Sequence, residues 1–244
     1  MAEIQMQRTT DFSSYRGAQP DQGFCEWLRY SSGPLWKTMV GHRFTRDMAT
    51  DRLLPDAFIR YLRYEHAFVR SAVEIFAHAL ILAPTVDDRA HMVAILQGLV
   101  GEQENYFQNR FTAMGLPPQP LSERELPDRA LALSEGALAI AARGTFEEIM
   151  SAMLAAEWMY HDWCTAAHAA RPRLAGPAEW IALHVAPHFA DQVAWAKRRI
   201  DALGPSLDSA HQARCADNFA RMLRLEIGFH DAPYESSGSS GTAV

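Results

Sequence analysis

The chain has 244 residues, of which 48% are hydrophobic and 21% are charged, and its formal net charge is −6. This composition is typical of a globular protein, and the acidic balance argues against a nucleic-acid partner because phosphate binding requires clustered Lys and Arg. No stretch approaches the ~18 consecutive apolar residues of a membrane span, so we expect no membrane partner either.

Helical periodicity dominates the sequence, and no alternating strand pattern is found. In the first half, Pro55 suits the first turn of a long helix, where its missing N–H is tolerated. Thr85 suits the N-cap of the next helix, which stops at Gly115. The helices predicted here span residues 21–30, 35–42, 55–83 and 85–114.

In the second half, Thr145 and Glu148 form a capping-box signature before an apolar run. Pro187 predicts a kink inside a later helix. Ser206 or Ser209 is expected to start the last helix, which ends near Pro233. The predicted helices span residues 122–143, irregular at its proline, then 145–170, 176–203 and 206–233.

These elements predict one compact all-α domain of seven to eight helices over residues 21–234. Residues 1–20 lack an apolar core and predict a flexible arm. Residues 235–244 are rich in Ser and Gly and predict a flexible tail.

Cys25, Cys164 and Cys215 are far apart and form no CxxC or zinc-type spacing. Their odd number and the lack of a signal peptide indicate a reducing cytoplasm, so we expect a cytoplasmic protein.

Glu157 and His161 lie four residues apart in an alanine-rich, strongly apolar helix. They could form an exposed helix-stabilising pair. A helix that is apolar nearly all round is buried, however, and a buried carboxylate is costly unless it is paired or functional. Glu157 is therefore a candidate for proton transfer, and His161 could equally be a core histidine.

Two further segments place ionisable groups one helical turn apart. His184 and His188, followed by Asp191, have a spacing that suits metal ligands on one helix face. Glu226 lies in an apolar run four residues before His230, and this pair could be a surface salt bridge or part of a site.

Tyr61, Glu65 and Phe68 share a face of the predicted helix over residues 55–83. The aromatic rings suit stacking on a flat, nitrogen-containing ring, and the carboxylate can accept hydrogen bonds from its amino groups. The alternative is that these residues are ordinary core.

Taken together, four segments resemble the TenA/thiaminase II family, which has the haem oxygenase-like all-α fold. The resemblance covers roughly residues 24–234. The matching segments are Phe58-x-x-Tyr61-x-x-Tyr64-Glu65-x-x-Phe68, Gly144-Thr145-Phe146-Glu147-Glu148-Ile149, Leu154-Ala155-Ala156-Glu157-Trp158-Met159-Tyr160 and Glu226-x-x-Phe229-His230-x-x-Pro233-Tyr234.

The resemblance implies hydrolysis of an aminopyrimidine in thiamin salvage. It places Glu226 at the proton-transfer glutamate, Glu65 at the pyrimidine-binding aspartate and His184 near a pocket tyrosine. Ala156 stands at the family's nucleophilic cysteine, so the chain resembles a cysteine-lacking, glutamate-type branch. Cys164 cannot replace that cysteine, because eight residues along a helix span ~12 Å.

The resulting prediction is a hydrolase in which a buried carboxylate, rather than cysteine, activates water. It needs no cofactor. The predicted catalytic residues are Glu226 and Glu157. The predicted substrate-binding residues are Glu65, Phe68, Tyr61, Tyr160, His184 and His230.

Two alternatives remain open. A non-haem di-iron oxidase of the same fold would take its iron ligands from Glu65, Glu157, His184, His188 and Asp191. A non-catalytic binding or regulatory protein would bind a small molecule without turnover. Relatives of this fold imply a homodimer or homotetramer in each case.

Overall fold

The computed structural model describes residues 11–235, and the predicted flexible segments therefore lie largely outside the described residues. Within this range the chain is all-α, as predicted, and contains no strand. The α-helices are α1 (Phe12–Ala18), α2 (Phe24–Ser31), α3 (Pro34–Val40), α4 (Arg43–Ala49), α5 (Pro55–Leu82), α6 (Val86–Gly98), α7 (Glu104–Ala113), α8 (Asp128–Ala141), α9 (Phe146–Ala169), α10 (Ala175–Val185), α11 (Pro187–Leu203) and α12 (Ser209–Asp231).

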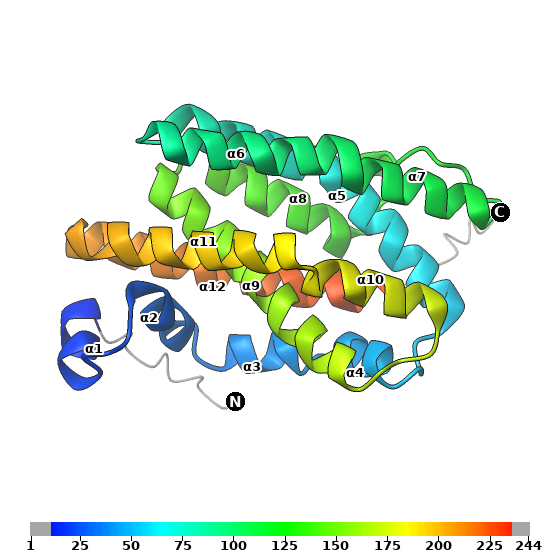
Figure 1. Ribbon diagram of the computed structural model, residues 1–244, viewed down its shortest axis with the longest axis horizontal. Helices are drawn as coiled ribbons and strands as arrows, with labels where there is room; N and C mark the ends of the chain where they lie inside the picture. The colour runs from blue at the N-terminus through cyan, green and yellow to red at the C-terminus, as the bar shows by residue number, and fades with distance from the viewer. Residues whose placement is uncertain (1–10, 236–244) are drawn as a thin grey trace, which may run out of the picture.

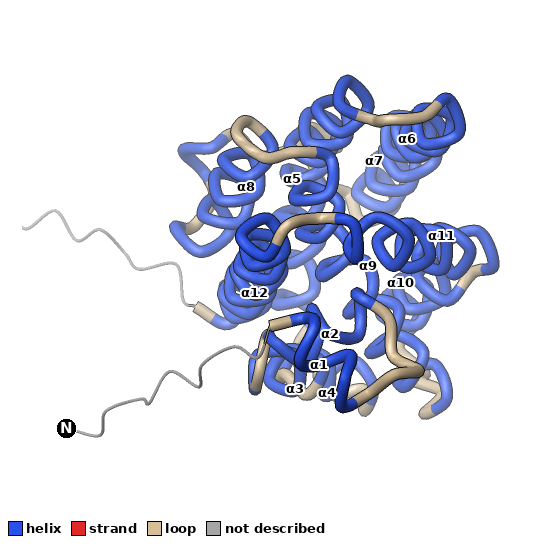
Figure 2. The backbone as a smooth tube through the Cα atoms, turned by 90° about the vertical axis from the view of Figure 1, so that its left-hand side faces the viewer, coloured by secondary structure: helices blue, strands red, loops and turns tan. Residues whose placement is uncertain are grey.

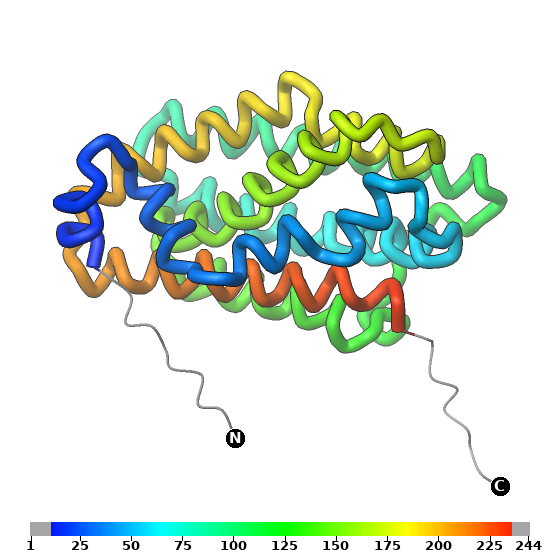
Figure 3. The backbone as a smooth tube through the Cα atoms, turned by 90° about the horizontal axis from the view of Figure 1, so that it is seen from below, coloured from blue at the N-terminus to red at the C-terminus, as the bar shows by residue number. Residues whose placement is uncertain are grey.

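Helix α9 is the central element of the bundle. It packs against α12 on one side and against α10 and α11 on another, and it also contacts α5 and α8 (Figures 1 and 2). Seen from below, α9 crosses obliquely between α11 and α12 (Figure 3). The short helices α2 and α3 pack against α12, and α4 packs against α9. A polar side chain on α9 can therefore face several neighbouring helices.

Side-chain caps fix where the long helices begin. Thr145 and Glu148 form the predicted capping box of α9, and Thr85 accepts a hydrogen bond from the Asp88 backbone N–H at the start of α6. The last helix begins at Ser209, one of the two predicted starts. Its N-cap is Asp208, whose carboxylate accepts from the backbone N–H of His211.

The chain divides into more helical segments than the seven to eight predicted. Ala186 adopts an extended conformation before Pro187, so the expected kink is a full break between α10 and α11. The predicted helix over residues 85–114 contains a π-helical turn at Leu99–Gln103. The predicted helix over residues 122–143 is interrupted before Pro127: a short 3-10 turn covers Glu123–Glu125, and α8 begins only after Pro127.

Part of the predicted N-terminal arm is ordered. Residues 12–18 form α1, in which Phe12 and Tyr15 are buried and Phe12 contacts Phe24 edge to face. The two aromatic residues supply the apolar surface that the prediction overlooked.

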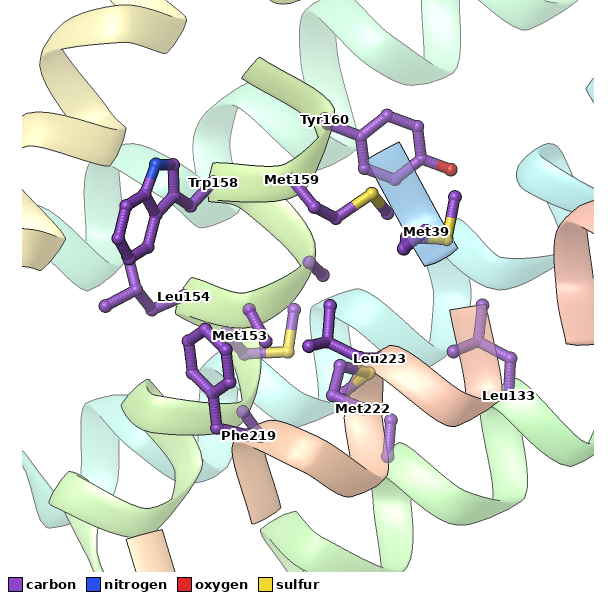
Figure 4. Packing of buried hydrophobic residues seen from close by; sticks show 14 of the residues in the cluster. Met39, Leu133, Met153, Leu154, Trp158, Met159, Tyr160, Phe219, Met222 and Leu223 are labelled. Carbon is purple, nitrogen blue, oxygen red and sulfur yellow. The ribbon is translucent and has the colours of Figure 1, made fainter. Parts of the chain in front are cut away.

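The core is one continuous cluster of buried apolar residues, rich in methionine and aromatic side chains. Figure 4 shows Met153 of α9 beside Met222 and Leu223 of α12, and Met159 of α9 pointing toward Met39 of α3. The three cysteines are free and buried. A search of the described helices for a span of membrane length and hydropathy found none.

Candidate active site

A cavity of about 860 Å³ lies between the central helix α9 and the surrounding helices α5, α6, α10, α11 and α12. Its size falls within the range of small-molecule sites. The ionisable residues on its wall are Glu65, His91, Glu102, Tyr106, Glu157, Tyr160, His184, His188, Asp191, Arg198 and Glu226.

A second hollow, of about 520 Å³, lies beside the loop between α9 and α10. Its wall consists of His168, Ala169, Arg171, Pro172, Ala178 and Ile181. Because no carboxylate lines it, the larger cavity is the better candidate for acid–base chemistry.

Glu65 of α5 and Tyr160 of α9 meet at the inner end of the larger cavity. The Tyr160 hydroxyl donates a hydrogen bond to Glu65 Oε1, and Tyr61 Oη lies 2.9 Å from Tyr160 Oη. Burial raises the pKa of Glu65 to about 7, although hydrogen bonds from Tyr160 and Tyr61 favour the ionised form. The two phenols therefore orient a carboxyl group that titrates near neutral pH.

Tyr61 differs from its predicted place. It is fully buried and is not part of the cavity wall. It supports Tyr160 from below through the hydroxyl–hydroxyl contact, so its position suits orientation of the Glu65–Tyr160 pair rather than contact with a ligand. Phe68, one turn further along α5, does line the cavity.

Glu226 of α12 is 2% exposed, and its Oε2 atom has no hydrogen-bond partner among the described residues. Burial raises its pKa well above the ordinary value, and the nearby negative charge of Glu65 raises it further. Both effects favour the protonated form of this carboxyl group, which lines the same cavity as Glu65.

His230, four residues after Glu226, is buried beneath the site and does not line the cavity. Its Nδ1 donates to the backbone carbonyl of Glu226 at 2.8 Å and lies 3.6 Å from Glu226 Oε2. Burial lowers the pKa of His230 to about 3, so the ring is neutral. The predicted contact with Glu226 exists, but direct binding of a substrate by His230 would require access that the structure does not provide.

Glu157 of α9 is 9% exposed and lines the cavity on the side of α11. Its Oε1 accepts a 2.8 Å hydrogen bond from Gln192 Nε2. Burial raises its pKa to about 7, and the hydrogen bond from Gln192 opposes that change. Glu157 therefore exchanges its proton close to neutral pH.

His184 of α10 forms part of the wall beside Tyr160, with the two rings stacked at a centroid distance of 5.0 Å. Its Nδ1 lies 2.9 Å from the carbonyl oxygen of Trp180. A carbonyl oxygen only accepts, so Nδ1 carries the proton and Nε2 is left as an acceptor. Burial lowers the pKa of His184 to about 4 and keeps the ring neutral.

Ala156 also lines the cavity, at the position predicted to replace a nucleophilic cysteine. Its neighbours on the wall include Met153 of α9 and Leu133 of α8. Cys164 is fully buried and is not on this wall. Burial also raises the pKa of the Cys164 thiol well above its ordinary value, which disfavours the reactive thiolate.

The proposed iron ligands all line the cavity but do not form a ligand cluster. His188 and Asp191 are exposed at the mouth on α11, whereas Glu65 is bonded to Tyr160 at the inner end. Within residues 11–235, no group of three or more His, Cys, Asp or Glu side chains is arranged to hold a metal ion. The donor arrangement therefore gives the iron alternative no support.

The wall residues that the sequence analysis did not identify include Tyr106, Trp180 and Gln192. Trp180 lies one turn before His184, so helical spacing could have identified it. Tyr106 follows the π-helical turn, which changes the face that α7 presents. Gln192 became recognisable only through its bond to Glu157.

Comparison with known proteins gives a consistent match over most of the chain. The family model described as the TENA/THI-4/PQQC family matches residues 31–236. An aminopyrimidine aminohydrolase of Halalkalibacterium halodurans is 20% identical over 213 residues, which cover 86% of this chain and 95% of that protein.

Solved structures are similar at the level of the fold. A TenA homologue from Pyrococcus furiosus has a TM-score of 0.79 at 20% identity, covering 86% of this chain and 100% of its own. A structure described as a TenA family transcription regulator from Silicibacter sp. TM1040 has a TM-score of 0.78 at 18% identity, covering 90% and 100%. A putative TenA-like thiaminase from Sulfolobus solfataricus has a TM-score of 0.70 at 17% identity, covering 87% and 96%.

Proposed function

Because the chain belongs to the TENA/THI-4/PQQC family, we propose that it is a hydrolase that acts on an aminopyrimidine or a related small heteroaromatic compound, as in thiamin salvage. The observation that carries the proposal is the placement of Glu65, Glu157 and Glu226 around one cavity. The relative from Halalkalibacterium halodurans, named an aminopyrimidine aminohydrolase, supports the substrate class.

The cavity contains polar groups suited to an aminopyrimidine ring. Glu65, oriented by the Tyr160 hydroxyl, can accept hydrogen bonds from an amino group of the substrate. Phe68 and the stacked Tyr160–His184 pair offer aromatic surface for the ring. The substrate would thus be held at the inner end of the cavity, beside Ala156.

The differences in carboxyl pKa suggest a division of roles. Glu226, whose burial favours the protonated form, suits the general acid, and Glu157, with a pKa of about 7, suits the general base. The sequence analysis predicts that a buried carboxylate activates water and gives Glu226 and Glu157 as the catalytic residues. The deeper burial of Glu226 and the charge of Glu65 favour the acid role for Glu226.

With these roles, water attacks the substrate directly and no covalent enzyme intermediate forms. Glu157 removes a proton from water, and the water oxygen forms a bond to the carbon that carries the exocyclic amine. The C–N bond breaks, and the Glu226 carboxyl proton passes to the departing nitrogen. The products are an alcohol and ammonia, and no thiolate is required at Ala156.

The proposal is tested by incubating the purified protein with an aminomethyl-pyrimidine and measuring ammonia release. Turnover that survives dialysis against a chelator supports the hydrolase. Turnover that is lost on chelation and restored by ferrous iron would favour the iron alternative. Ligand binding without any turnover would favour a binding or regulatory protein.

A further inference from the structure

Besides the Glu226 carboxyl group, two polar side chains on the cavity wall have no hydrogen-bond partner among the described residues. These are the indole N–H of Trp180 on α10 and the hydroxyl of Tyr106 on α7. Both atoms are buried. Buried polar groups in folded proteins are nearly always paired, so an unpaired group beside a cavity indicates a partner supplied by a ligand.

The two residues lie together and next to the inner end of the cavity. Their ring centroids are 5.8 Å apart. The Trp180 ring is also 4.6 Å from His184 and 5.6 Å from Tyr61. This part of the wall therefore adjoins the Glu65–Tyr160 pair.

The chemistry of these groups is selective. An indole N–H can only donate, and burial raises the pKa of Tyr106 above its ordinary value, which keeps its hydroxyl protonated as a donor. The neutral His184 ring presents an acceptor at Nε2 beside them. Two donors next to acceptors complement a ring nitrogen that neighbours an amino group.

We propose that Trp180 and Tyr106 determine substrate specificity by donating hydrogen bonds to the ring nitrogens of the substrate, while Glu65 and His184 accept from its amino group. This inference rests on the proposed function, because it names the recognition of the same aminopyrimidine. It adds two residues that distinguish a pyrimidine from a carbocyclic or pyridine ring of the same shape.

The test uses Trp180→Phe and Tyr106→Phe, which remove the donors and retain aromatic rings. The matched control is Trp163→Phe. The Trp163 indole N–H is also buried and without a partner among the described residues, but Trp163 is not part of the cavity wall. Thermal unfolding of each variant establishes that it is folded.

Binding is measured by calorimetry with a hydroxymethyl-pyrimidine, the alcohol that the proposed hydrolysis would produce, so that affinity does not depend on turnover. The comparison ligands are the two pyridine analogues in which one ring nitrogen is replaced by carbon. The difference in binding free energy between the pyrimidine and each pyridine analogue is then compared between wild type and each variant, which isolates the contribution of each donor.

We expect wild type to bind the pyrimidine about 5- to 10-fold more tightly than at least one pyridine analogue, as one neutral hydrogen bond allows. Trp180→Phe or Tyr106→Phe should abolish that preference, and Trp163→Phe should preserve it. Unchanged preference in both cavity variants would overturn the inference and leave the hydrolase proposal intact. Failure of wild type to bind any of these rings would also overturn it, and the ammonia assay would then decide the hydrolase proposal separately.

Discussion

Tyr160 on α9 donates a hydrogen bond to Glu65 on α5, although the two residues are 95 positions apart in the chain. The bond joins the central helix to its neighbour at the inner end of the cavity. It also favours the ionised form of a carboxyl group whose burial opposes ionisation. The ionisation of Glu65 therefore depends on two opposing effects, burial and the hydrogen bond from the Tyr160 hydroxyl group.

Removing that hydroxyl should shift the pH dependence of activity. The bond from Tyr160 lowers the pKa of Glu65, so Tyr160→Phe should raise this pKa above about 7. The rise of kcat/KM with pH should then occur at higher pH than in wild type. Tyr64→Phe, which removes a hydroxyl group from α5, the helix of Glu65, is the control and should leave the profile unchanged. An identical profile for Tyr160→Phe would show that the bond does not control ionisation of Glu65.

The wild-type enzyme should have a bell-shaped profile of kcat/KM against pH. Activity should rise as Glu157 and Glu65 lose their protons near pH 7. It should fall at higher pH as Glu226 loses the proton that it donates to the leaving amine. Steady-state rates across pH measure both limbs. A profile that stays flat across neutral pH would contradict the assignment of acid and base.

The buried carboxyl group of Glu157 should lower stability as pH rises. Its pKa is raised in the folded protein, so the unfolding free energy falls between the unfolded value of about 4.5 and the folded value of about 7. This difference corresponds to about 3 kcal/mol. Gln at this position cannot ionise. The unfolding free energy of Glu157→Gln minus that of wild type should therefore increase by roughly that amount from pH 5 to pH 8.

Urea unfolding of both proteins at the two pH values measures this change. The comparison with Glu157→Gln is needed because His184 affects the pH dependence of stability in the opposite direction. The pKa of His184 is lowered to about 4, so its contribution to stability is lost as pH falls below 6.5. An equal stability difference at both pH values would mean that Glu157 is not buried as described.

A thiol placed at position 156 should be reactive, because Ala156 lines the cavity and is 7% exposed. The natural cysteines are buried, and burial raises the pKa of each. Ala156→Cys should therefore gain one site for iodoacetamide by mass spectrometry. Ala155→Cys, at a position with 0% exposure, should gain none. Equal labelling of the two variants would contradict the position of the cavity wall.

The sequence predicted those features that depend on local chemistry. The capping residues Thr145 and Thr85 are confirmed because a side chain that bonds the next turn needs no distant partner. The apolar context of Glu157 correctly indicated burial, whereas that of Glu226 left a surface salt bridge and a site both open, and the structure buries Glu226 as well. The break at Ala186 was predicted only as a kink, because a proline alone does not show whether the preceding residue becomes extended.

Features that depend on three-dimensional packing could not be predicted. Tyr61 shares a helical face with Glu65, yet it lies beneath the cavity because α9 places Tyr160 above it. The pairing of Gln192 with Glu157 depends on where α11 starts after the break. A helical pattern indicates which residues share a face, and the neighbouring helices decide how deep each one lies.

The central claim is that buried carboxyl groups, rather than cysteine, carry out hydrolysis in the cavity beside Ala156. Its most direct test is ammonia release from an aminomethyl-pyrimidine by wild type and by Glu226→Gln, which is nearly isosteric but cannot donate a carboxyl proton. We predict that wild type releases ammonia and that the variant remains folded but loses about 100- to 10,000-fold in kcat. Wild-type kcat in Glu226→Gln would contradict the account.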